Sequence, residues 1–146
     1  MEFRHVRLDD AAEMARLAGE LGYPMSTAEM ARRIGVLLPD ERHYIAVAAA
    51  GDHLLGWVHV EHRSSLEGGD RAELMGLVVD SSARRRGLGR ELVGVAENWA
   101  GAQGLSAVTV RSNAARDLSH PFYDALGYSR EKTQHVYRKA VTPSRR

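Results

Sequence analysis

The spacing of hydrophobic residues alternates along this chain between the two-residue period of a strand and the longer period of a helix. Alternating positions and short apolar runs predict five strands, over Phe3–Leu8, His43–Ala50, Leu54–His62, Arg71–Asp80 and Ser106–Asn113. Helical spacing predicts four helices: one from a cap at Asp9 or Asp10 to Gly22 and Pro24, one between Ser26 and Pro39, and two over Leu88–Ala102 and His120–Leu126. We expect Tyr128–Lys139 to add one or two final strands.

Local signals set the borders and the order of these elements. Ser26 and Glu29 form a capping box, Gly51–Asp52 suits a hairpin turn, and the polar stretch Arg63–Asp70 is expected to be a loop. Leu74–Val79 is almost continuously apolar, which is typical of a strand at the centre of a sheet. The order predicts a layered α/β or α+β domain, in which helices cover the faces of a mixed sheet.

Composition narrows the functional classes. The chain has 146 residues, 44% of them hydrophobic, which suits one compact domain over 1–139 and a polar tail over 140–146. The 20 basic and 19 acidic residues give a net charge of +1, so we expect no nucleic-acid partner. The absence of cysteine excludes disulfides, thiolate metal sites and a cysteine nucleophile. Neither a signal core nor a membrane-spanning run is present, so we expect a cytoplasmic protein without a membrane partner.

The turn Arg84–Gly89, RRRGLG, carries the strongest chemical signal, because it joins an apolar strand to a helix. The first N–H groups of a helix have no partner within it, and the helix dipole favours an anion there. Gly87 and Gly89 have no Cβ, so an anionic group can approach the main chain closely. Together with the three arginines, these features predict a cradle for a phosphate or diphosphate.

The turn does not match two other phosphate-binding patterns. A nucleoside-triphosphate loop is unsupported because no lysine follows the second glycine, and the dinucleotide pattern G-x-G-x-x-G fails because Leu92 replaces its third glycine. An ordinary helix start with solvated arginines is the alternative. A nucleic-acid patch is disfavoured, since the turn has no aromatic residues for stacking.

The turn also resembles that of a known family. Arg84, Gly87 and Gly89 match R-x-x-G-x-G, and the chain here resembles the GCN5-related N-acetyltransferase (GNAT) superfamily, whose coenzyme A signature is Q/R-x-x-G-x-G/A. AELMGLVVD is similar to the family's fourth strand, and VRSNAARDLSHPFYDALGY to its second acetyl-CoA segment. LGYPMS and WVHV are similar to a bacterial subgroup near the aminoglycoside acetyltransferases. The resemblance runs from about Phe3 to Lys139 and implies a mixed, mostly antiparallel sheet of six to seven strands with about four helices.

The resemblance implies acetyl-CoA as cosubstrate and direct acetyl transfer to a primary amine of a small molecule or protein. A non-catalytic acyl-CoA-binding or sensing module is the alternative function, and a homodimer is compatible with the family. The main chain of Leu77 and Val79 would pair with the pantetheine arm. The implied cofactor-binding residues are Leu77, Val78, Val79, Arg84, Arg85, Arg86, Gly87, Leu88, Gly89, Arg90, Asn113 and Tyr123. Asn113 alternatively ends its strand by turn preference alone.

Two residues are candidates for proton transfer. By the resemblance, Tyr123 would protonate the departing sulfur; alternatively it is a core aromatic. Glu73 is the only acid within the apolar part of its strand and is the candidate base, because burial raises the pKa of a carboxyl group. Strand alternation places Glu73 on the face of Met75 and Leu77. The alternative for Glu73 is a strand-end carboxylate paired with Arg71 or Arg111.

The acceptor-binding residues are expected in two loops. Tyr23 and Met25 in the first loop, together with Glu73, are the substrate-binding candidates, and Glu67 and Asp70 lie in the second. Such loops are also ordinary surface. We expect no metal site, because the odd separation of His59 and His62 directs them to opposite faces of a strand. His120 would either orient Tyr123 or cap its helix.

Overall fold

The computed structural model describes residues 1–84, 86–111 and 119–144, and the chain divides into two compact units, Met1–Arg111 and Ser112–Arg146. The elements of the first unit are β1 (Glu2–His5), α1 (Ala11–Glu20), α2 (Thr27–Leu37), β2 (His43–Ala50), β3 (His53–Ser65), β4 (Gly69–Val79), α3 (Leu88–Ala102) and β5 (Val108–Val110). Short 3₁₀ turns, η1 (Leu8–Asp10) and η2 (Ser81–Ala83), precede α1 and α3. The second unit contains α4 (Ser119–Ala125).

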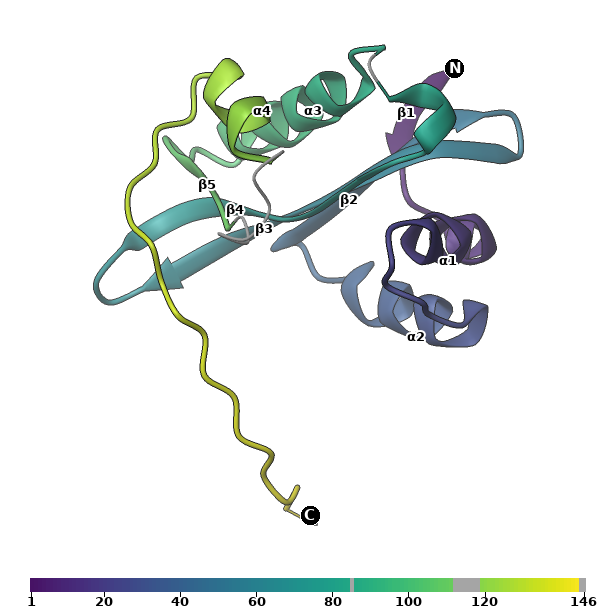
Figure 1. Cartoon of the computed structure of the whole chain (residues 1–146). Coiled ribbons are helices and arrows are strands. Elements are labelled where there is room, and N and C mark those ends of the chain that lie inside the picture. The colour runs from purple at the N-terminus through teal and green to yellow at the C-terminus, as the bar shows by residue number, and fades with distance from the viewer. Residues whose placement is uncertain (85, 112–118, 145–146) are drawn as a thin grey trace. The chain divides into compact units, whose positions relative to one another are not determined.

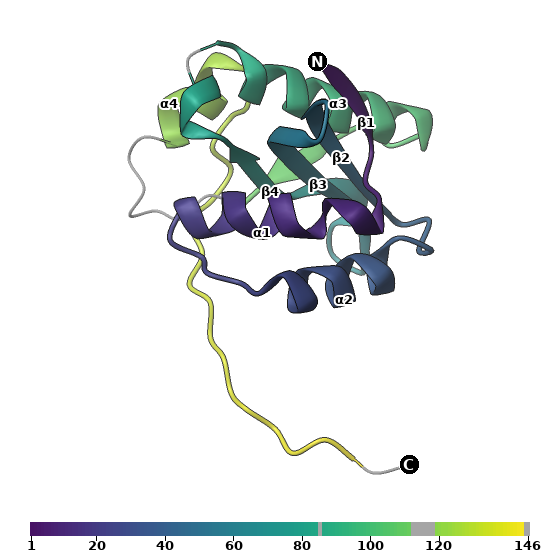
Figure 2. The same ribbon diagram turned by 90° about the vertical axis from the view of Figure 1, so that its right-hand side faces the viewer.

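The first unit is a sheet between two helical layers. Its strands lie in the order β1-β2-β3-β4-β5, antiparallel except for the parallel pair β4 and β5. Helices α1 and α2 cover one face of the sheet and α3 covers the other (Figures 1 and 2). The predicted mixed sheet with helices on its faces is thus confirmed.

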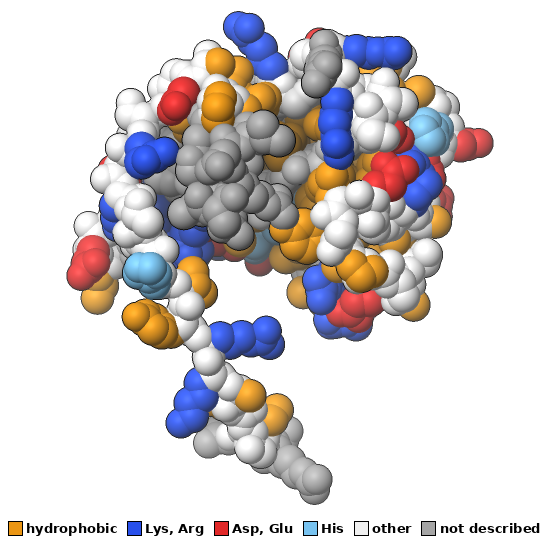
Figure 3. Space-filling model, in the orientation of Figure 1, with side chains coloured by type: hydrophobic (Ala, Val, Ile, Leu, Met, Phe, Trp, Pro, Cys, Tyr) orange, Lys and Arg blue, Asp and Glu red, His pale blue; other side chains and the backbone are white. Residues whose placement is uncertain are grey.

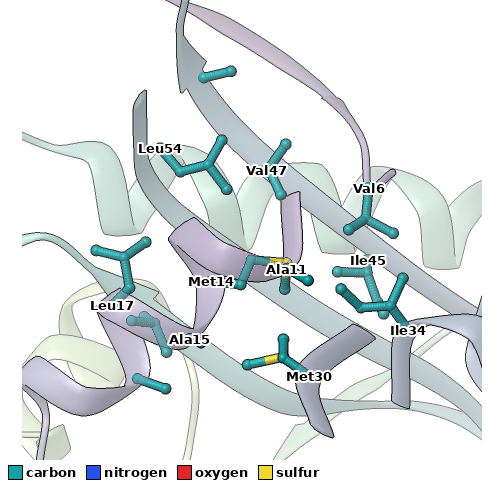
Figure 4. Close-up of a cluster of buried hydrophobic side chains, with 13 residues drawn as sticks. Val6, Ala11, Met14, Ala15, Leu17, Met30, Ile34, Ile45, Val47 and Leu54 are labelled. Atoms are coloured by element: carbon teal, nitrogen blue, oxygen red, sulfur yellow. The ribbon is translucent and has the colours of Figure 1, made fainter. Parts of the chain in front are cut away.

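Apolar side chains from both α1 and α2 close over the sheet. Figure 4 shows Met14 and Leu17 of α1, Met30 and Ile34 of α2, and Val47 of β2 in one cluster of buried residues. Burying each such side chain contributes about 1.5–3 kcal/mol. The predicted cap also forms, since the Ser26 hydroxyl accepts the Glu29 N–H at 3.0 Å. On the opposite face α3 buries Leu92, Val93 and Ala96.

The segment predicted as a loop, Arg63–Asp70, is instead mostly a hairpin. Strand β3 continues to Ser65 and β4 begins at Gly69, so only residues 66–68 form the turn. The expectation failed because these residues are polar and exposed, although ladder hydrogen bonding does not require apolar side chains. The hairpin extends the sheet at the end of β3 and β4.

The predicted six to seven strands are not confirmed. The described residues contain five strands, and none forms within Tyr128–Lys139. Val136 and Tyr137 are 87% and 92% exposed. An extended segment becomes a strand only when a neighbouring segment pairs with its N–H and C=O groups, and within the described chain no such pairing reaches residues 129–139.

Candidate functional site

The edge of β4 that faces β5 is open over half its length. The two strands pair only from Ala72 to Leu74, opposite Val108–Val110. From Met75 to Val79, β4 continues without a strand partner on this side among the described residues. Alternate N–H and C=O groups along this open edge can therefore pair with an extended ligand. Leu77, Val78 and Val79, predicted to bind the cofactor, all lie on it.

A β-bulge marks the start of the open edge. On β3, Val60 pairs with Leu74 and His59 with Gly76, so Met75 is the extra residue of β4 and is 45% exposed. The bulge also corrects the predicted alternation. Glu61 and His59 share a face of β3 and pair with Glu73 and Gly76, so Glu73 shares its face with Gly76 and not with Met75.

Gly76 lies in close contact with the side chain of Trp57. A Cβ there would lie 3.0 Å from Cζ3 of Trp57. The indole Nε1 of Trp57 is buried and has no acceptor among the described residues. Trp57, which sequence reasoning had not singled out, therefore packs against β4 directly beside the bulge.

The open edge leads into the predicted anion cradle. Gly87 is the N-cap of α3, with a φ of 78°, and makes no side-chain cap hydrogen bond. A Cβ at Gly87 would meet no atom within 4 Å, so the space beside it is open. The first amides of α3, from Leu88, Gly89 and Arg90, are thus available to an anion. Arg84 and Arg86 are exposed beside the turn, whereas Arg85 lies outside the described residues.

A buried carboxylate anchors the segment before the cradle. Asp80 accepts the Ser82 N–H at 2.9 Å and pairs with Arg16 of α1 at 3.2 Å. These contacts, the Ser82 N–H first, hold the pKa of Asp80 below its usual value despite burial. Arg16 also donates to the Leu54 carbonyl at 3.1 Å, so one guanidinium ties α1 to β3 and to the cradle.

Glu73 is buried and fully engaged. Its Oε2 accepts from Arg63 at 2.9 Å, and its Oε1 lies 3.2 Å from Arg111 Nε and 3.5 Å from the Thr109 hydroxyl. The alternative prediction paired Glu73 with Arg71 or Arg111. Arg111 does contact Glu73, whereas Arg71 donates a hydrogen bond to Ser65. The carboxylate is therefore held between two guanidinium groups.

Beside Glu73 lies a group of side chains that the sequence did not reveal. His43 Nδ1 is 2.9 Å from His59 Nε2, and His43 Nε2 is 3.2 Å from Glu61 Oε2. Arg63 connects this group to Glu73, because its guanidinium lies 3.5 Å from Glu61 and 2.9 Å from Glu73. Only the pairing of the strands brings these residues together, because His43, Glu61 and Glu73 lie opposite one another on β2, β3 and β4.

The acceptor candidates have varied surroundings. Tyr23 is 54% exposed, and Met25 packs against the α1 and α2 cluster. Glu67 and Asp70 are exposed at the β3–β4 hairpin, where Asp70 pairs with His62 at 3.2 Å. Met25 therefore contributes to a packed surface.

The remaining predicted residues belong to the second unit. Tyr123 of α4 packs edge-on against Phe122 and Tyr128, with ring centroids 5.0 and 5.8 Å away, and burial raises the pKa of its phenol. Asn113 and the side chain of His120 lie outside the described residues. The ring contacts of Tyr123 are compatible with an aromatic residue that packs the second unit. Its raised pKa means that the hydroxyl is protonated at neutral pH.

Comparison with known proteins assigns the family. Residues 8–128 match the model of the acetyltransferase (GNAT) family. An uncharacterised N-acetyltransferase, YhdJ of Bacillus subtilis (strain 168), is 32% identical over 80 residues, which are 54% of this chain and 55% of that protein. The match therefore spans about half the length of this curated relative.

Solved structures share the fold at low identity. Aminoglycoside 6'-N-acetyltransferase AAC(6')-IG from Acinetobacter haemolyticus superposes with a TM-score of 0.84 at 18% identity, covering 97% of this chain and 100% of that one. AAC(6')-Iy in complex with the bisubstrate analogue CoA-S-monomethyl-acetylneamine gives 0.84 at 18% identity, covering 96% and 98%. A putative acetyltransferase from Agrobacterium tumefaciens gives 0.83 at 20%, covering 95% and 100%. With its open β4 edge, its glycine turn and this family match, the chain belongs to the acetyltransferase (GNAT) family.

Proposed function

We propose that the protein is an acetyl-CoA-dependent N-acetyltransferase that acetylates a primary amine of a small molecule. One observation carries this proposal: the open edge of β4 over Met75–Val79 is followed along the chain by the short turn η2 and then by the glycine turn that begins α3. An extended pantetheine arm can pair with such an edge while its diphosphate meets the first amides of the helix. The small-molecule class is supported by the aminoglycoside acetyltransferases among the structural neighbours.

The residues present fit this cosubstrate. Gly87 leaves open space at the helix start, and Arg84 and Arg86 supply positive charge beside it. Holding both substrates in line contributes much of the rate in direct transfer, so no covalent intermediate is required. Leu77, Val78 and Val79 are the proposed main-chain partners of pantetheine, and Tyr123 is the proposed acid for the sulfur.

The test is an assay of free thiol. Acetyl-CoA is mixed with the protein and a panel of aminoglycosides, polyamines, amino acids and peptides, and calorimetry measures CoA binding separately. We expect thiol release above the rate without protein for at least one small amine. Release with peptides alone would make a protein the acceptor. CoA binding without release would indicate a non-catalytic acyl-CoA-binding module, and no binding would contradict the proposed cradle.

A further inference from the structure

A chain of titratable side chains crosses the sheet on the face that α1 and α2 cover. We call His59, His43, Glu61 and Asp40 the histidine chain. His59 Nε2 lies 2.9 Å from His43 Nδ1, and His43 Nε2 lies 3.2 Å from Glu61 Oε2 and 3.8 Å from Asp40 Oδ2. Within the described residues no group of three or more histidines and carboxylates is arranged so that it could hold a metal ion.

One end of the histidine chain lies beside the bulge. His59 pairs with Gly76, the residue after Met75, where the open edge of β4 begins. The strand register places His59 on the same face as Trp57 and Glu73. An amine that approaches the open edge from the α1 and α2 face therefore comes next to His59.

The other end reaches the surface. Asp40 and His43 both line a cavity of about 320 Å³. The Asp40 side chain is 47% exposed, whereas that of His43 is 14% exposed. A proton that reaches Asp40 can therefore exchange with solvent without passing back through the site.

Glu73 is poorly placed to perform the same task. Each of its oxygens already contacts a guanidinium, Arg63 at 2.9 Å and Arg111 at 3.2 Å. Protonation of buried Glu73 would remove its charge from contact with both cations, and Arg63 would keep the longer contact with Glu61 at 3.5 Å. Glu73 instead suits a structural role between its partners.

We propose that His59 accepts the proton of the acceptor amine and passes it through His43 to Glu61 and Asp40 at the surface. This proposal rests on the proposed acetyl transfer. The amine N–H bond breaks toward the second ring nitrogen of His59, while His59 Nε2 gives its proton to His43 Nδ1, and His43 Nε2 gives its own to a carboxylate. The nitrogen electron pair forms the bond to the carbonyl carbon, and the C–S electrons leave with sulfur, which takes a proton from its own acid or from water.

The charge environment supports transfer through His59 and not storage on it. Burial, and then the neighbouring His43, lower the pKa of His59 to about 4. His59 faces His43 on β2. His43 in turn faces Glu61 on β3 and Asp40 before β2, and Arg63 and Glu73 lie beyond Glu61. His59 is therefore neutral at neutral pH and does not retain a proton there, so a proton that reaches it must move on to His43 in the same step.

The variants His59→Gln and His43→Gln test this relay. For His59→Gln we expect kcat to fall by about 10²- to 10⁴-fold, while the Kd for CoA changes less than about twofold, because His59 lies outside the proposed CoA contacts. For His43→Gln we expect a smaller loss of kcat and an acid limb of the pH–rate profile at higher pH, since removing His43 raises the pKa of His59. The control is His62→Gln, on the same strand but paired with exposed Asp70, which should keep the wild-type rate.

The wild-type profile is a second measurement that needs no variant. After the rate is corrected for the uncharged fraction of the acceptor amine, its acid limb should lie below about pH 5, and a corrected acid limb near pH 6.5, the ordinary histidine value, would overturn the relay. Wild-type kcat in His59→Gln, or an unmoved acid limb in His43→Gln, would overturn it as well. A wild-type protein that binds CoA but acetylates no amine would overturn the proposed function together with the relay, whereas normal turnover by His59→Gln would overturn the relay alone.

Discussion

At the scale of single residues, buried acids in the first unit are matched by specific donors. Asp10 is 7% exposed, and both its oxygens accept from Arg4 at 2.9 Å, with a third bond from the Arg7 N–H at 2.8 Å. Burial raises the pKa of Asp10, but the bonds from Arg4 and Arg7 outweigh it, so the pKa lies below its usual value. The ion pair therefore fixes β1 to the start of α1 only while Asp10 is ionised.

The variant Asp10→Asn tests this dependence. A lowered folded-state pKa adds stability above the unfolded value of about 3.9, and that stability is lost as pH falls through the folded value. We expect the free energy of unfolding of the variant to be about 2–4 kcal/mol lower than that of wild type at pH 7, because Arg4 loses its ion pair with residue 10. This difference in the free energy of unfolding should shrink below about pH 4. Urea unfolding at pH 7 and pH 3 measures both effects. Asp9→Asn, at an exposed neighbouring position, is the control; a deficit that is equal at the two pH values would contradict the argument.

Tyr123 gives a second prediction at this scale. The variant Tyr123→Phe keeps the ring that packs against Phe122 and Tyr128 but removes the hydroxyl. If the phenol protonates the sulfur, kcat should fall by about 10²-fold or more, with little change in CoA affinity or melting temperature. Phe122→Leu alters the same packing without touching the hydroxyl and serves as the control. Unchanged turnover across pH would assign Tyr123 to the core alone.

At the scale of elements, the apolar pattern predicted most helices and strands but not their pairing. Helix α3 begins at Leu88 and ends at Ala102 as expected, because its apolar face and its flanking glycines are local signals. The bulge at Met75 has no such signal, since it depends on the register between β3 and β4. The partners of Glu73 were uncertain for the same reason: Arg63 and Arg111 reach it from neighbouring strands and not along its own.

The two ends of α3 allow a matched test of the cradle. Gly87 and Gly104 have φ values of 78° and 80°, and a Cβ at either would meet no atom within 4 Å. Gly87→Val and Gly104→Val should therefore pay a similar backbone penalty of about 1–3 kcal/mol and lose similar thermal stability. Only Gly87→Val should weaken CoA binding, by about tenfold or more, because its side chain fills the space beside the first amides of the helix. Calorimetry with CoA separates the two, and equal affinities would contradict the placement of the diphosphate at this turn.

At the scale of the whole molecule, charge is balanced and distributed. On α2 the arginines Arg32 and Arg33 both pair with Glu29, at 2.7 and 3.0 Å, and Figure 3 shows basic beside acidic side chains over the region of α1 and α2. No helix within residues 1–84, 86–111 and 119–144 has the length and apolar character needed to cross a bilayer. Composition alone had indicated this balance, whereas the position of the arginines at the turn carried the specific signal for an anion.

The rise in melting temperature on ligand binding can show how much of the binding free energy comes from the β4 edge and how much from the turn before α3. A ligand that binds only the folded protein at 100 times its Kd adds about 2.7 kcal/mol, which raises the melting temperature of a chain of this size by about 5–10 °C. We expect CoA to give this shift at a much lower concentration than pantetheine, because pantetheine can pair with the open edge but has no diphosphate for the first amides of α3. In Gly87→Val the advantage of CoA over pantetheine should largely disappear, while in Gly104→Val it should persist. Equal potency of the two ligands on the wild-type protein would place the binding energy on β4 and remove the turn from the site.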